Sequence, residues 1–147
     1  MIKKMLPGLA AALVAAALIG APGDVRGQET IEASTAGVQP VSWDAWLAAK
    51  ANAEKRDAEG DYVAALQYYL EYVRQAQGLN SPGRVAWGKN NAAYMIIKMY
   101  REDPTVDLTP AQKLLEEALD VPEASEECRD VLTRNLVYVR SCLGRRG

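Results

Sequence analysis

The residues of this chain that could do chemistry are few, and their spacing does not assemble a catalytic set. None of the 147 residues is a histidine, which excludes zinc sites with His ligands and triads in which His is the base. The adjacent pairs Glu116 with Glu117 and Glu126 with Glu127 point about 100° apart on a helix, so neither pair shares a site. The sequence also lacks a Cys-x-x-Cys motif. We therefore expect a protein that is not an enzyme and that needs no metal or cofactor.

Two cysteines, Cys128 and Cys142, are the thiols that could form a disulfide. They lie 14 residues apart in a segment predicted to be one helix. At about 1.5 Å per residue the helix separates them by roughly 21 Å, which is beyond bridging distance. Three interpretations stay open: two small buried hydrophobic residues, an intramolecular bridge across a break in the helix, or an intermolecular bridge.

The first 23 residues have the order of a secretory signal peptide. A pair of lysines precedes an apolar run at residues 9–19, and small residues follow at 20–23. The apolar run is too short for a comfortable membrane span. Cleavage after Gly23 or after Gly27 fits the small-residue rule, and an uncleaved anchor is the alternative. We expect an exported protein, periplasmic or secreted, that touches a membrane only through an uncleaved leader.

Loss of residues 1–23 removes two lysines and no acid, which leaves 15 basic and 19 acidic residues and a net charge of -4. Such a mildly acidic domain has no electrostatic reason to bind nucleic acid or anionic lipid. The partner we expect is another protein or a peptide.

The rest of the chain divides into a linker and one helical domain. Residues 24–41 mix Gly, Pro, Ser, Thr and acids without periodicity, which predicts a flexible linker. From Ser42, a good N-cap, apolar residues recur at helical spacing, and no segment alternates like a strand. Helices are predicted over about residues 43–59, 61–77, 84–101, 109–120 and 125–143. The sequence therefore predicts an all-α domain of antiparallel helices over residues 42–147.

The sharpest pattern is Gly60-Asp61-Tyr62 followed by Ala65 and Tyr69. It resembles the tetratricopeptide repeat, in which a first helix ends at Gly-Asp-Tyr and a second carries a small residue and then an aromatic at these positions. Residues 108–118 repeat the pattern of such a second helix, although Ala111 lies 46 residues after Ala65 and the usual period is about 34. A generic helical bundle explains the same residues.

The resemblance implies a short array of about five helices, stacked as hairpins, that follows the predicted signal peptide. The first helix of each pair would line a concave groove. Carried over by position, the residues of this protein-binding groove are Lys50, Glu54, Asp57, Asn91, Ala92 and Met95. The peptide-carboxylate clamp known in this family needs a Lys followed one turn on by an Asn, and here Glu54 follows Lys50, so that clamp is not supported.

Three asparagines, Asn90, Asn91 and Asn135, lie on or beside apolar helix faces. Each is expected to bond a neighbouring backbone and fix the helix register. The alternative, implied by the resemblance, is that Asn90 or Asn91 grips the main chain of an extended peptide.

The expectation for function is an exported, tetratricopeptide-like, non-catalytic adaptor in the cell envelope. Because two hairpins make a marginal array, we expect self-association or a bound partner to stabilise it. The alternative is a structural subunit of a disulfide-linked or helical-bundle oligomer.

Overall fold

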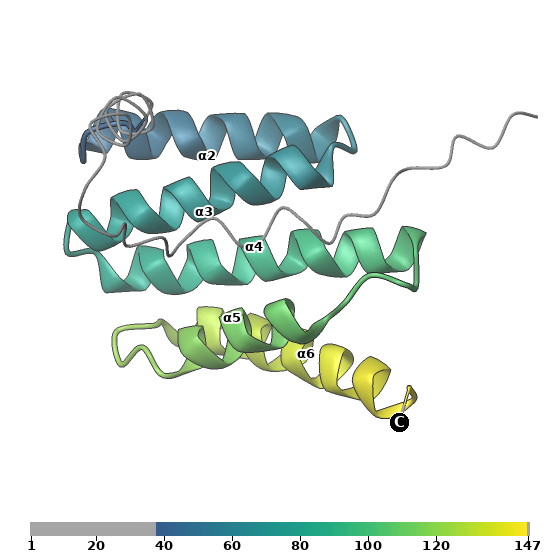
Figure 1. Cartoon of the computed structure of the whole chain (residues 1–147). Coiled ribbons are helices and arrows are strands. Elements are labelled where there is room, and N and C mark those ends of the chain that lie inside the picture. Colours follow the sequence, from purple (N-terminus) through teal and green to yellow (C-terminus); the bar gives the residue numbers. More distant parts are fainter. Residues whose placement is uncertain (1–37, 147) are drawn as a thin grey trace, which may run out of the picture. The chain divides into compact units, whose positions relative to one another are not determined.

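The computed structural model describes residues 38–146, and this part of the chain is built from α-helices. They are α2 (Trp43–Ala58), α3 (Tyr62–Gly78), α4 (Pro82–Glu102), α5 (Thr109–Leu119) and α6 (Glu126–Gly144), drawn in Figure 1. No strand occurs among the described residues, so the predicted all-α class is confirmed. The predicted signal peptide and residues 24–37 of the predicted linker lie outside the described residues.

Consecutive helices run in alternating directions, as Figure 1 shows, so that α2, α4 and α6 share one direction and α3 and α5 share the other. Each helix packs against the next one along the chain. Helix α4 also contacts α6, which makes it the central helix of the domain. The surface between α4 and α6 is therefore formed by two helices that are not neighbours in the sequence.

The turn between α2 and α3 depends on Gly60 and Asp61. Gly60 has a φ of +76°, in the left-handed region where side chains are strained. Asp61 caps α3, because its carboxylate accepts a hydrogen bond of 3.1 Å from the amide of Ala64. Past the turn, Ala65 and Tyr69 are buried against α2 and α4, at 0% and 6% exposed. Ala65 and Tyr69 therefore pack the hairpin together and join it to α4.

Helices α3 and α4 approach each other closely at Gly88. A Cβ built there would lie 2.4 Å from the Cδ1 atom of Tyr72 and 2.8 Å from the Cγ2 atom of Val73. Real Cβ atoms do not come so close to other heavy atoms, and Tyr72 is itself only 5% exposed. Glycine is thus the residue that this contact requires.

The largest part of the core lies between α4, α5 and α6. It combines alanines, which let the helices approach, with branched aliphatic side chains that fill the space between them. Its fully buried members include Ala93, Ile97, Leu108, Ala111, Leu115, Ala118, Cys128, Leu132 and Val139.

Arg129 stabilises the loop between α5 and α6. Its guanidinium group donates hydrogen bonds to four backbone carbonyls at the end of α5 and in the loop that follows. The acceptors are the oxygens of Leu119 at 3.0 Å, Val121 at 2.7 Å, Pro122 at 3.2 Å and Ala124 at 3.2 Å. One side chain therefore holds the whole loop and the end of α5.

The chain is packed against α3 before α2 begins. The buried side chain of Gln75 accepts a 2.9 Å hydrogen bond from the amide of Ser42 and donates one of 3.1 Å to the carbonyl of Pro40. A longer bond of 3.4 Å joins it to the carbonyl of Gln39. We call residues 39–42 the N-terminal strap. Residues 39–41 fall at the end of the predicted linker, so the ordered domain begins before Ser42.

Replacing Gln75 with Leu is expected to release the N-terminal strap. Gln75→Leu removes one acceptor and two donors, so the free energy of unfolding should fall by about 1–2 kcal/mol. Hydrogen exchange at the Ser42 amide measures the release, and its protection should disappear. Gln77→Leu is the control, because Gln77 is exposed on the same helix. Unchanged protection at Ser42 in Gln75→Leu would show that the strap is held by something else.

Candidate protein-binding site

The groove residues predicted on the first helix form ion pairs within the domain. On α2, the Lys50 ammonium group lies 2.5 Å from the Glu54 carboxylate, and both side chains are exposed. Asp57 pairs at 2.6 Å with Lys98 of α4, with both side chains about three-quarters buried. The Asp57–Lys98 pair ties α2 to α4, so Asp57 is engaged within the domain.

Two of the three groove residues predicted on the third helix, Ala92 and Met95, face inward, which corrects the sequence-based prediction. Ala92 is 0% exposed and Met95 is 2% exposed, because α3 packs over this face of α4. Neither side chain can meet a partner. Asn91 is half-buried, and its side-chain oxygen accepts a long hydrogen bond of 3.4 Å from Asn90.

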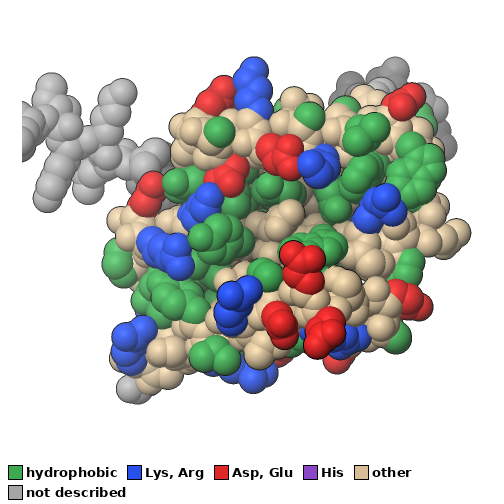
Figure 2. Space-filling model, turned by 180° about the vertical axis from the view of Figure 1, so that it is seen from behind, with side chains coloured by type: hydrophobic (Ala, Val, Ile, Leu, Met, Phe, Trp, Pro, Cys, Tyr) green, Lys and Arg blue, Asp and Glu red, His purple; other side chains and the backbone are tan. Residues whose placement is uncertain are grey.

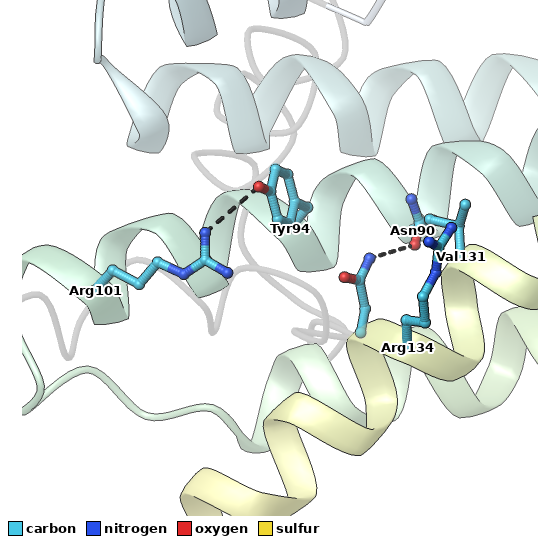
Figure 3. Close-up of a pocket in the computed structure, with 6 residues that line it drawn as sticks. Asn90, Tyr94, Arg101, Val131 and Arg134 are labelled. Atoms are coloured by element: carbon cyan, nitrogen blue, oxygen red, sulfur yellow. Dashed lines mark hydrogen bonds between the residues drawn. The ribbon is translucent and has the colours of Figure 1, made fainter.

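An open hollow lies elsewhere, between α4 and α6. Its volume is about 370 Å³, and its lining combines two arginines, two asparagine amides, a phenol and one aliphatic side chain. The lining residues are Asn90, Tyr94, Arg101, Val131, Arg134 and Asn135. Figure 3 shows Arg101 at one end of the hollow and Arg134 at the other, with Tyr94 between them. We call this hollow the α4–α6 groove.

The floor of the α4–α6 groove is an asparagine pair. The Asn135 amide nitrogen donates a 2.9 Å hydrogen bond to the side-chain oxygen of Asn90, which is 4% exposed. The partner of Asn90 is thus a side chain on another helix instead of the neighbouring backbone that we expected. Within residues 38–146, no donor bonds to the Asn135 oxygen, which leaves this acceptor free at the surface of the groove.

Neither groove arginine pairs with a carboxylate in the described part of the chain. No ion pair among the described residues involves Arg101 or Arg134. The Arg101 guanidinium donates a 3.4 Å hydrogen bond to the Tyr94 hydroxyl and lies 5.1 Å from the ring centroid of Tyr138. Tyr138 and Tyr94 stabilise the charged form and raise the pKa of Arg101 above its usual range.

Cations and aromatic rings continue past the groove toward α2. The Lys98 ammonium group lies 5.4 Å from the ring centroid of Tyr62 and 5.1 Å from that of Tyr94. Because Arg101 lies 5.6 Å from the same Tyr94 ring, the two cations share it. The face drawn in Figure 2 mixes basic, acidic and apolar side chains.

The two cysteines are free and buried. Helix α6 is continuous from Glu126 to Gly144, so no turn brings Cys128 and Cys142 together. Their exposures of 0% and 2% also leave no sulfur at the surface for an intermolecular bridge. In this fold both residues pack as small hydrophobic side chains, and burial raises the pKa of the Cys128 thiol.

We expect both thiols to be protected in the folded protein. Reaction with 5,5′-dithiobis(2-nitrobenzoate) should be slow in native buffer, and both thiols should react after unfolding in guanidinium chloride. The protein should also migrate as a monomer on non-reducing gels. A disulfide-linked dimer, or fast labelling of a native thiol, would contradict the buried positions of Cys128 and Cys142.

Among residues 38–146, no group of three or more His, Cys, Asp or Glu side chains could hold a metal ion. None of the described helices has both the length and the apolar character needed to cross a membrane.

Arg101 and Arg134 were not among the predicted binding residues, although Arg134 has a local signal in the sequence. Val131, Arg134 and Asn135 lie at positions i, i+3 and i+4, so they share one face of α6. Asn90 and Tyr94 are likewise one turn apart on α4. The pairing of these two faces joins residues 45 positions apart, which local spacing does not reveal.

Comparisons with known proteins identify no relative: no protein-family model, no curated protein and no solved structure matches this chain.

Proposed function

We propose that this protein is an exported, non-catalytic, tetratricopeptide-like module that binds another protein through the α4–α6 groove. The proposal of export rests on the order of charged, apolar and small residues in the leader. The repeat-like arrangement is supported by the hairpin at Gly60-Asp61-Tyr62, by the shared direction of α2, α4 and α6, and by the contact of α4 with α6.

The observation that carries the proposal is the unsatisfied chemistry of the groove. Arg101 and Arg134 offer donors without a carboxylate, and the Asn135 oxygen offers an acceptor. An extended peptide carries main-chain N–H groups and side chains that complement such a surface. Val131 adds an apolar contact in the same hollow. The rigid helices hold these groups in place before a partner arrives, which limits the entropy lost on binding.

A peptide selection tests this function. The full-length chain is used to select from a displayed library of random ten-residue peptides, and the dissociation constants of the selected peptides are measured. Val131→Trp fills the groove and is expected to weaken binding about tenfold or more. Val137→Trp is the matched control, because Val137 lies on the same helix, is 64% exposed and does not line the groove. Peptides whose affinity is unchanged by Val131→Trp would contradict the proposal.

Self-association is a second candidate, favoured by exposed apolar residues on α2. Trp43 and Leu47 lie one turn apart and are 47% and 54% exposed. A helical oligomer would bury this pair, as expected for a short array with an uncovered first helix. Sedimentation equilibrium tests it: the wild type should form a dimer that Leu47→Glu dissociates. A monomer at all concentrations would rule this candidate out.

A further inference from the structure

The lining of the α4–α6 groove contains two arginines, Arg101 and Arg134, and no Asp or Glu. Elsewhere in residues 38–146 some cations pair with an acid, as Lys89 does with Glu117 at 2.7 Å and Arg140 with Glu116 at 2.8 Å, and others, such as Lys55 and Arg84, do not. Arg101 and Arg134 have no acidic partner within these residues. The groove therefore concentrates positive charge on a chain whose net charge is -2.

From this charge, we propose that the partner segment bound in the groove is acidic, with one carboxylate held by Arg101 and a second held by Arg134. This inference rests on the proposed function, because it names the chemistry of the peptide that the groove takes. A guanidinium group can hold a carboxylate through two parallel hydrogen bonds, which is the strongest contact that these side chains make. The Asn135 oxygen then accepts from the main chain of the peptide between the two carboxylates.

Helix geometry sets the spacing of the two acids. Arg101 follows Asn90 by 11 residues on α4, which is about 16 Å along the helix. Arg134 is adjacent in sequence to Asn135, the partner of Asn90. An extended peptide advances about 3.3 Å per residue, so acids four residues apart span roughly 13 Å. The flexible arginine side chains cover the remaining difference.

Defined peptides test the inference on the full-length chain labelled with ¹³C and ¹⁵N at arginine. The probes are acetyl-SEVTVES-amide and acetyl-SQVTVQS-amide, which differ only in charge. The acidic peptide should shift the Nε–H signals of Arg101 and Arg134 and bind about tenfold more tightly than the neutral one at low salt. This preference should shrink at high salt, because added ions screen exposed charges.

The double variant Arg101→Gln with Arg134→Gln should lose the preference for the acidic peptide. Arg140→Gln is the matched control, since Arg140 lies on α6 outside the groove and its loss should leave the preference intact. The amide spectrum of each variant reports whether the fold is kept. A preference that survives the double variant would overturn the inference.

Three other outcomes also overturn it. Equal affinities for the two peptides would leave a peptide-binding groove with no anion subsite, so the proposed function would stand without this inference. If neither peptide bound, the inference that the ligand is acidic would be wrong, and the peptide selection alone would then test the proposed function. If inorganic phosphate shifted both arginines as strongly as the acidic peptide, the groove would be a general anion site that also suits nucleic acid or lipid headgroups.

Discussion

Gly88→Ala is expected to lower the free energy of unfolding by about 2–3 kcal/mol. The new Cβ would lie 2.4 Å from the Tyr72 ring and 2.8 Å from Val73. Both side chains are buried, so α3 and α4 have to move apart to admit it. Urea denaturation followed by circular dichroism measures the loss, which corresponds to a fall in Tm of about 10 °C or more.

Gly83→Ala is the matched control for this prediction. Gly83 lies on the same helix, and a Cβ there meets only the Glu123 carbonyl oxygen at 3.5 Å, an ordinary contact. Alanine also has a higher helix propensity than glycine, so this variant should be neutral or slightly more stable. If the Gly88→Ala and Gly83→Ala variants were equally stable, the claim that α3 and α4 leave no room for a Cβ at position 88 would be contradicted.

Arg129→Ala is expected to cost about 2–3 kcal/mol of unfolding free energy, because hydrogen bonds from a charged donor are worth more than neutral ones. Its guanidinium group holds the loop between α5 and α6 through the carbonyls of residues 119, 121, 122 and 124. The loss should be local as well as global. Hydrogen exchange should therefore increase most at the end of α5 and in this loop.

Arg140→Ala provides the comparison on the same helix. Arg140 makes one exposed ion pair with Glu116, and such surface pairs are worth about 1 kcal/mol or less. Its unfolding free energy should therefore stay close to that of the wild type. A loss in Arg129→Ala no larger than in Arg140→Ala would contradict the role of Arg129 as the support of the loop.

The helices were predictable because their signals are local. Gly60 stops α2, and Ser42 and Ser125 cap α2 and α6 through bonds to the amides of Ala45 and Cys128. One start was misplaced: α4 begins at Pro82, since proline suits the first helical position. Helix α5 begins at Thr109, as predicted, and the Asp107 carboxylate accepts a hydrogen bond of 2.9 Å from the Thr109 amide.

The candidate site was not predictable in the same way, because it depends on contacts between distant segments. Met95 is apolar, as a core residue would be, but it also lies one turn from the polar Asn91. The spacing along α4 alone therefore does not say whether another helix covers Met95. The structure places α3 over Ala92 and Met95 and leaves the opposite side of α4 to α6. Likewise, only the packed domain shows that Gln75 holds the N-terminal strap.

The central claim is that the α4–α6 groove is where a partner binds, and crosslinking in cells that naturally produce the protein tests it most directly. Tyr94 lines the groove and is replaced by p-azidophenylalanine, which keeps its shape. The control replaces Tyr68, a half-buried tyrosine on α3 outside the groove. Irradiation should join position 94 to a partner protein, through a segment rich in Asp and Glu, and leave position 68 free. A partner captured at position 68 and not at position 94 would contradict the account.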